Sequence, residues 1–181
     1  MEQPQGAING SIVAGSFQSG ELTFHGGTMR VLAVETLEAL QQYVGKEIGV
    51  SEWLAVTQER INQFAEATED HQWIHVDPER ARRESPYHAT VAHGFLTLSL
   101  ISHLMKDAIR IGGTRLAINY GLNRVRFPCP VRAGSRIRGR LTLLAMRDRG
   151  DAEEVVLSCS VECEGSEKPC CIAEWIVRYY K

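Results

Sequence analysis

The most apolar segment of the chain, residues 91–109, constrains the fold more than any other feature of the sequence. His93, His103 and Lys106 interrupt it, and it also holds Gly94 and three hydroxyl side chains, which makes it a poor candidate for a membrane span. A segment of this length and composition is typical of a helix that is buried in a protein core. We therefore predict a helix over about residues 92–109 and expect no membrane partner.

The residues after this helix change to the pattern of a β-sheet. Apolar Ile137, Leu141 and Leu143 alternate with Arg138 and Arg140, as expected for a strand with one face on a core. Turn residues separate four predicted strands, which span 116–127, 135–148, 153–163 and 169–180. The economical way to bury the helix is to wrap this antiparallel sheet around it, which is an α+β arrangement.

Three shorter helices are predicted before the apolar segment. Thr36 caps the first, which Gly45 ends, and Thr57 caps a second over residues 57–68. A third begins at Asp77-Pro78-Glu79, because Asp is a good N-cap, proline suits the first helical position and glutamate favours the positive end of the helix dipole. Residues 84–90 are predicted to form a loop.

The 181 residues are enough for one domain, with or without an appendage. Residues 1–28 are rich in glycine and weakly patterned, so we expect a loosely ordered extension or leader, followed by a single domain over residues 29–181. Either Met29 is the true initiator, or the extension packs on the domain through two short strands. These strands would contain Ile12, Val13 and Phe17, and Leu22 and Phe24.

Charge and cysteine content exclude some partners and compartments. The net charge is −2 and no basic block is present, so nucleic acid is not an expected partner. The five cysteines are odd in number and form no CxxC motif, which favours a reducing cytoplasm. Cys159 and Cys163 share a face of one predicted strand and can meet Cys170 or Cys171 across a hairpin. A disulfide or a metal pair there is the alternative to ordinary buried thiols.

The candidate chemistry lies in Asp70-His71-Gln72-Trp73-Ile74-His75, just before the third helix. An Asp and a His held near one another can polarise a water between them, with the imidazole acting as general base or acid. Non-helical chain between Asp70 and His75 would let both side chains reach one water. The alternative is structural, with Asp70 at a helix end and His75 on a backbone partner, and the spacing alone favours that alternative.

His93-Gly94, at the head of the apolar helix, is the second candidate feature. The first backbone N–H groups of a helix lack internal partners and, with the helix dipole, favour a developing negative charge. Glycine would let a substrate approach this backbone closely. Tight packing of Gly94 against the sheet is the competing explanation.

Taken together, these segments closely resemble the MaoC-like dehydratases, a family that includes (R)-specific enoyl-CoA hydratases. The resemblance rests on residues 67–81 with the Asp-His-Gln-Trp-Ile-His run, on Val91-Ala92-His93-Gly94-Phe95, and on residues 98–102 and 119–128. It covers residues 29–181, and the Asp-His-Gln-Trp-Ile-His run is typical of the nodulation protein N-like branch. Agreement of several segments in order is more specific than either motif alone, and it favours a catalytic role for Asp70 and His75.

The resemblance implies a hot-dog fold, in which an antiparallel sheet wraps around one long apolar helix, commonly as a homodimer with one continuous sheet. It also implies hydration of trans-2-enoyl thioesters in fatty acid metabolism, or the reverse dehydration. Asp70 and His75 match the pair that activates water, and Gly94 matches the glycine whose N–H stabilises the thioester oxygen. Ser102 matches a serine that supports the pair.

The chain departs from the family after Asp70, where many hydratases have Asn-Pro. Gln72 is expected to order the loop in place of that Asn, and the bulky Trp73 to reshape the acyl pocket. The remaining candidate substrate contacts are His93, Phe95, Arg124, Arg126, Arg132 and the arginines of residues 80–83, for which solvated surface charge is the alternative. No metal or redox cofactor is expected, because the thioester itself makes C3 electrophilic.

Two other functions remain open at this point. A hot-dog acyl thioesterase would use the same helix end but attack the carbonyl carbon, commonly with a lone carboxylate, and the Asp70 and His75 pair disfavours it. A non-catalytic acyl-thioester-binding accessory protein is the other, because a fold does not fix a function.

Overall fold

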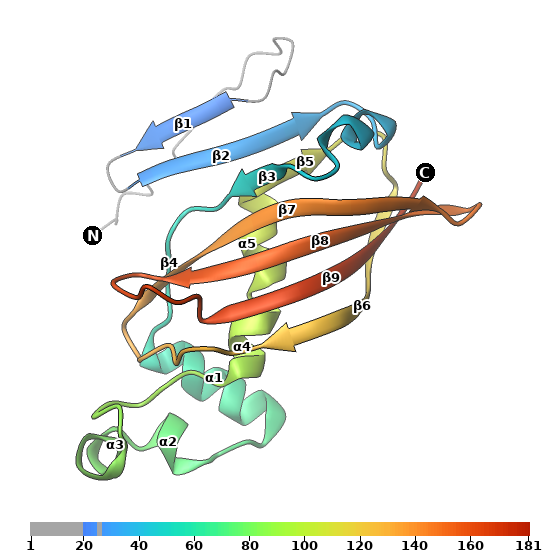
Figure 1. Cartoon of the computed structure of the whole chain (residues 1–181). Helices are drawn as coiled ribbons and strands as arrows, with labels where there is room; N and C mark the ends of the chain where they lie inside the picture. The colour runs from blue at the N-terminus through green and yellow to red at the C-terminus, as the bar shows by residue number, and fades with distance from the viewer. Residues whose placement is uncertain (1–19, 25–26) are drawn as a thin grey trace, which may run out of the picture.

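The structure is a computed structural model that describes residues 20–24 and 27–181 (Figure 1). The apolar segment is helical, as predicted, but it forms two consecutive helices, α4 (Gly94–Ser99) and α5 (Ile101–Ala108). The division at Leu100 is local, because the N–H groups of both His103 and Leu104 donate to the Leu100 carbonyl at 3.0 Å and tighten one turn. Within the described part of the chain, no helix is long and apolar enough to cross a membrane.

The four predicted strands are all present and confirm the α+β class. They are β6 (Leu116–Arg126), β7 (Arg136–Asp148), β8 (Ala152–Cys163) and β9 (Cys171–Tyr180). The sequence analysis missed β2 (Gly27–Val34), β3 (Glu47–Val50), β4 (Leu54–Ala55) and β5 (Ile109–Ile111). The sheet order is β1-β2-β3-β7-β8-β9-β6, with antiparallel neighbours throughout, while β5 joins β2 in parallel and β4 pairs with β7.

Strand β1 (Gly20–Phe24) pairs with β2 and contains Leu22 and Phe24, the second of the two short strands considered for the extension. The first, around Ile12 to Phe17, lies outside the described residues. The division of the chain at Met29 therefore stays a prediction.

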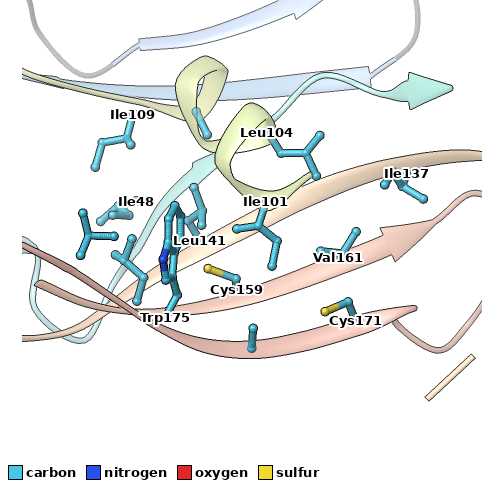
Figure 2. Close-up of a cluster of buried hydrophobic side chains, with 14 of the residues drawn as sticks. Ile48, Ile101, Leu104, Ile109, Ile137, Leu141, Cys159, Val161, Cys171 and Trp175 are labelled. Atoms are coloured by element: carbon cyan, nitrogen blue, oxygen red, sulfur yellow. The ribbon is translucent and has the colours of Figure 1, made fainter. Parts of the chain in front are cut away.

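The sheet curves around α4 and α5, which lie behind β7, β8 and β9 in Figure 1. Figure 2 shows Ile101 and Leu104 of the helix pointing at the inward side chains of the sheet, among them Leu141 and Trp175. Alternate residues of β8 face this core, which are Val155, Leu157, Cys159, Val161 and Cys163. The four long strands therefore bury one face, as the alternation predicts.

Two glycines allow the helix to approach the sheet closely. A Cβ added to Gly49 of β3 would come within 2.5 Å of the carbonyl oxygen of Ala108 and 2.8 Å of its Cβ. A Cβ at Gly139 of β7 would stand 3.2 Å from the Cβ of Leu104. Glycine at Gly49 is thus required by the contact between sheet and helix.

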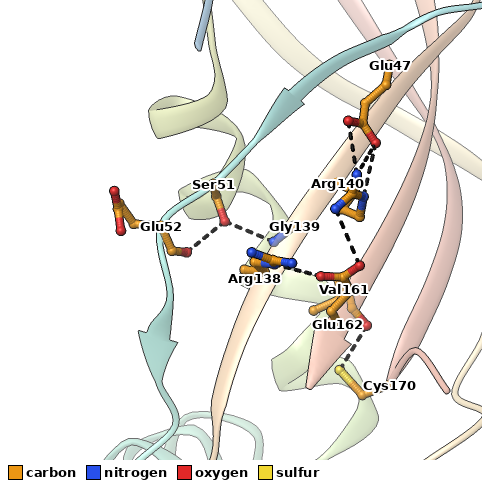
Figure 3. Close-up of polar contacts among 9 residues, drawn as sticks. All are labelled: Glu47, Ser51, Glu52, Arg138, Gly139, Arg140, Val161, Glu162 and Cys170. Atoms are coloured by element: carbon orange, nitrogen blue, oxygen red, sulfur yellow. Dashed lines mark hydrogen bonds and ion pairs between the residues drawn. The ribbon is translucent and has the colours of Figure 1, made fainter. Parts of the chain in front are cut away.

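The outward face of the sheet carries cross-strand ion pairs, some of which Figure 3 shows. Arg138 pairs with Glu162 at 2.6 Å, and Arg140 pairs with Glu47 at 2.8 Å. Glu154 is almost fully covered and accepts from Arg147, Arg149 and Arg178, and these hydrogen bonds, led by that of Arg149, lower the pKa of its carboxyl to about 2. Several arginines on this face therefore already form ion pairs with glutamates.

The shorter helices follow the predicted caps. Helix α1 (Gln58–Thr68) begins after Thr57, whose side chain accepts from the Arg60 N–H, and α3 (Pro78–Glu84) begins after Asp77. The helix predicted after Thr36 is a 3-10 helix, η1 (Glu38–Tyr43), in which the Leu40 N–H donates to the carbonyl of Leu37, three residues earlier, at 3.1 Å. Gly45 follows it with a φ of +82°.

All five cysteines carry free thiols. Burial raises the pKa of Cys159 to about 12 and that of Cys171 to about 11. Since the thiolate is the reactive form, these buried thiols are inert at neutral pH and act as small apolar side chains.

We expect Gly49→Ala to lower the free energy of unfolding by about 1–3 kcal/mol, because the added methyl would overpack the contact with the buried Ala108. Urea denaturation measures this change. Gly121→Ala on β6 is the matched control, since a Cβ there meets nothing within 4 Å. Equal stability of the two variants would contradict the prediction.

Candidate active site

Asp70 lies at a sharp turn that follows α1. Helix α1 ends at Thr68, and Glu69 adopts the left-handed conformation with a φ of 59°, which is uncommon for a residue other than glycine. The turn exposes the Asp70 side chain, of which 55% is accessible. The Gln72 N–H contacts one Asp70 carboxylate oxygen at 3.5 Å, so the carboxylate keeps capacity for another donor.

His75 stands on a single helical turn, α2 (Trp73–Val76), where non-helical chain was predicted. The prediction was wrong because His75 N–H donates to Gln72 O at 2.9 Å and Asp77 N–H to Trp73 O at 3.0 Å, which closes one turn just before Pro78. Gln72 thus orders the loop through its backbone carbonyl, and its side chain makes no cap hydrogen bond.

The His75 ring is fixed by the chain that leads into α4. Its Nδ1 lies 2.6 Å from the carbonyl oxygen of Val91, and because a carbonyl only accepts, Nδ1 carries the proton. The lone pair of Nε2 therefore remains available. Burial lowers the pKa of His75, more than the hydrogen bond to Val91 and the charge of Asp70 raise it, so the ring is neutral at pH 7.

Two residues that the sequence analysis missed, Gln58 and Thr90, hold this turn by side-chain hydrogen bonds. Gln58 Nε2 donates to the backbone carbonyl of His75 at 2.8 Å, and Thr90 donates to the Gln58 side-chain oxygen. Gln58 lies in the first turn of a predicted helix, where nothing in the local pattern distinguishes it from a solvated residue.

His93, one of the candidate substrate contacts, is only 3% exposed and lies against both members of the pair. Its Nε2 is 2.9 Å from the Asp70 carbonyl oxygen, and its ring stacks on that of His75 with 3.8 Å between centroids. The structure thus assembles Asp70, His75 and His93, from which one polar atom each lies within 4.8 Å of the others. One water, hydrogen bonded at about 2.8 Å to each of two such atoms, can bridge this distance.

Three such groups could also be considered as metal ligands. A histidine-bound metal lies in the plane of the ring that binds it, whereas the rings of His75 and His93 are stacked with only 27° between their planes. Their lone pairs therefore do not converge on one point, and the arrangement fits a bridging water better than a metal ion.

Gly94 is the first residue of α4, directly after His93. Its N–H has no partner within the helix. A Cβ at this position would stand 2.9 Å from the ring of Phe127, so the glycine allows tight packing of the helix end, as the competing explanation expected. Phe95, which is 70% exposed, contacts the same ring edge-on at 6.2 Å between centroids.

Ser102 lies farther along the helix, in a groove between α5 and the sheet. Asn119 of β6, which the sequence analysis did not single out, donates to the Ser102 hydroxyl at 3.4 Å. Two adjoining cavities of about 270 Å³ each share Ser102, Asn119 and Trp175. The first begins at Leu98, one turn beyond Gly94, and the second continues past Met105. The two cavities together form what we call the helix groove.

The remaining candidates lie around this centre. Trp73 is covered by the Arg80 guanidinium at 4.5 Å, and Arg80 also pairs with Glu84 at 2.8 Å. Arg124 pairs in register with Glu174, whose neighbours Ala173 and Trp175 face the core, so Arg124 lies on the outward face of β6. Arg126 shares that face and donates to the Val125 carbonyl at 2.7 Å.

Comparison with known proteins finds relatives of the whole domain. The family model of the MaoC like domain matches residues 39–163. The chain is 50% identical over 146 residues to 3-hydroxyacyl-thioester dehydratase Z of Mycobacterium tuberculosis. The matched region covers 80% of this chain and 96% of that protein. It is 48% identical over 135 residues to nodulation protein N of Rhizobium leguminosarum bv. viciae, covering 74% of this chain and 84% of the relative. The crystal structure of a MaoC-like dehydratase from Rhodospirillum rubrum is similar with a TM-score of 0.64 at 25% identity, over 81% of this chain and 97% of that one.

We expect the pKa of His75 to lie below 6.5, because burial disfavours the charged ring. The folded protein then binds a proton at His75 less readily than the unfolded chain does. His75 therefore lowers the free energy of unfolding as the pH falls below 6.5 and has no such effect above it. NMR titration of the histidine ring signals, with His75→Gln to assign the signal, measures the value. A value at or above 6.5 would contradict the expectation.

Proposed function

The chain belongs to the MaoC-like family of dehydratases, and from that premise we propose that it is an (R)-specific hydratase of trans-2-enoyl thioesters. The class of the activity is that of a hydro-lyase, and the same site would dehydrate 3-hydroxyacyl thioesters in the reverse direction. The observation that carries the finer proposal is the approach of Asp70 and His75 to within 4.8 Å, beside the helix that begins at Gly94.

The proposed reaction begins with a water held between the Asp70 carboxylate and Nε2 of His75. Because Val91 holds the proton on Nδ1, the neutral ring accepts a proton from the water at Nε2. The water oxygen bonds to C3 of the enoyl thioester as the C2–C3 double bond opens. The electrons move toward the thioester oxygen, and the proton returns from the pair to C2, so atoms and charge balance.

Gly94 supplies the second half of the proposed chemistry. Its free N–H and the start of α4 would face the thioester oxygen and stabilise the negative charge that develops there. The substrate itself provides the electrophilic carbon, so the proposed reaction uses no redox or metal cofactor.

The helix groove is the proposed site of the acyl chain. Gly94, Leu98, Ile101 and Met105 follow one another at helical spacing, so the groove continues along the face that starts at the proposed oxyanion site. Its lining is largely apolar, which suits a hydrocarbon chain. Trp73, covered by Arg80, stands outside this lining.

We expect the protein to hydrate crotonyl-CoA and a medium-chain enoyl-CoA, measured as loss of enoyl absorbance and as formation of the (R)-3-hydroxyacyl product. Asp70→Asn and His75→Gln should each lower kcat/KM by about 10²–10⁴-fold, because the amide side chains can hydrogen bond to the water but cannot accept its proton. His71→Gln is the matched control, since His71 is exposed beside the pair.

The outcomes separate the competing functions. Release of free CoA thiol without hydration would identify a thioesterase, and binding without turnover of any enoyl-CoA would identify an accessory protein. Activity that survives both Asp70→Asn and His75→Gln would overturn the assignment of the site.

We also propose that two copies form a homodimer through β6. This strand is at the edge of the sheet and pairs only with β9 among the described strands. It exposes Leu116, Ile118, Tyr120 and Leu122, each 42–55% accessible. An apolar edge strand of 11 residues requires cover to avoid aggregation, and antiparallel pairing with a second β6 provides it.

We expect Ile118→Lys to shift the protein from dimer to monomer in light scattering after size exclusion, because the charge would enter the proposed interface. Leu144→Lys on β7 is the control, as Leu144 is 40% exposed against 42% for Ile118 but lies away from the edge. A monomeric wild-type protein, or an unchanged dimer for Ile118→Lys, would refute the interface.

A further inference from the structure

His93 is a buried polar residue that the proposed reaction does not use. The side chain is 3% exposed, and its Nδ1 has no hydrogen-bond partner among the described residues. Leaving a buried polar atom unpaired costs about 1–3 kcal/mol, so its retention calls for a physical reason.

His93 contacts both Asp70 and His75 and directly precedes Gly94. Its Nε2 faces the carbonyl oxygen of Asp70 at 2.9 Å and therefore donates to it. Its ring stacks on His75 on one side, and Phe64 of α1 contacts it at 5.1 Å between centroids. Its own backbone precedes Gly94 and accepts from the Thr97 N–H at 3.2 Å, in the first turn of α4.

These contacts define the hydrogen-bonding role of His93. With the proton on Nε2, Nδ1 carries only a lone pair, which has no donor facing it among the described residues. The titratable side chains that face it are Asp70, from the turn after α1, and His75, from α2, while α1 presents Phe64. Nε2 of His93 is thus engaged by the Asp70 backbone, whereas Nε2 of His75 keeps its lone pair available.

We propose that His93 is a positioning residue that fixes the catalytic pair relative to the start of α4. Its hydrogen bond to the Asp70 carbonyl sets the position of the carboxylate, and its stacked ring sets the plane of His75 and shields one face of that ring from water. The residue that carries both contacts is bonded directly to Gly94. The pair and the oxyanion N–H are therefore held by one side chain and its own backbone. This inference rests on the proposed function for its kinetic consequences, but not for its effect on His75.

Two substitutions separate the two contacts. His93→Phe keeps a ring against His75 but cannot donate to Asp70, and it removes the unpaired Nδ1, so the melting temperature should stay at or above that of the wild type. We expect kcat for the enoyl-CoA to fall about ten-fold or more with KM changed less than about three-fold, because the carboxylate is no longer held in place.

His93→Gln can still donate to the Asp70 carbonyl but removes the stacked ring. Water then reaches the exposed face of His75, and the pKa of His75 measured by NMR should rise toward 6.5, with the acid limb of kcat/KM moving the same way. A residue that only filled space would leave both the titration and the pH profile unchanged once the variant is folded.

The two variants test the hydrogen bond and the ring stacking separately. A folded His93→Phe variant with wild-type kcat would overturn the role of the hydrogen bond, and an unchanged His75 titration in His93→Gln would overturn the role of the stack. A wild-type protein that turns over no enoyl thioester would refute the proposed function, whereas the His75 titration would still test the stack in that case.

Discussion

The close approach of α5 to the concave face of the sheet is the contact on which the rest of the structure depends. Gly49 admits the end of α5, and Gly139 admits Leu104, so the helix lies directly on β3 and β7. This contact fixes the axis of α4 and α5, and with it the position of Gly94 at one end and of the helix groove along one side. A rigid helix of this kind allows a single glycine N–H to be aimed at a substrate.

The turn that carries Asp70 and His75 is attached to that helix through backbone groups. His75 reaches the Val91 carbonyl, the Ile74 carbonyl accepts from the Val91 N–H at 3.1 Å, and Ala92 N–H donates to Val131 O at 2.8 Å. The strand-like segment before α4 therefore connects the turn that carries Asp70 and His75 to the chain that leads into β7. Gln58 of α1 donates to the His75 carbonyl and accepts from Thr90, which joins α1 to the same unit.

Features that depend on neighbouring residues in the chain could be predicted from the sequence. Features that depend on contacts between distant residues could not. The long strands carry alternation and glycine turns at Gly134, Gly150 and Gly165, all with positive φ, so their bounds were predicted to within about two residues. The short strands β3 to β5 have too few residues to show a period, and their pairing is set by partners far along the chain. Asp70, His75 and Gly94 carry recognisable local motifs, whereas Gln58 and Asn119 act through contacts 17 or more residues away that no local pattern reveals.

The charged and polar groups of the site are arranged in a way that suits addition of water to a polarised double bond. Asp70 carries the exposed carboxylate on the side where the water is proposed to sit, and burial lowers the pKa of the His75 ring beside it. The start of α4 is partially positive on the other side, where electrons would accumulate on the thioester oxygen. A positively charged His75 would weaken this polarity and could not accept a proton. Burial of His75 against the His93 ring therefore serves the proposed chemistry, because it disfavours the charged form of the proposed base.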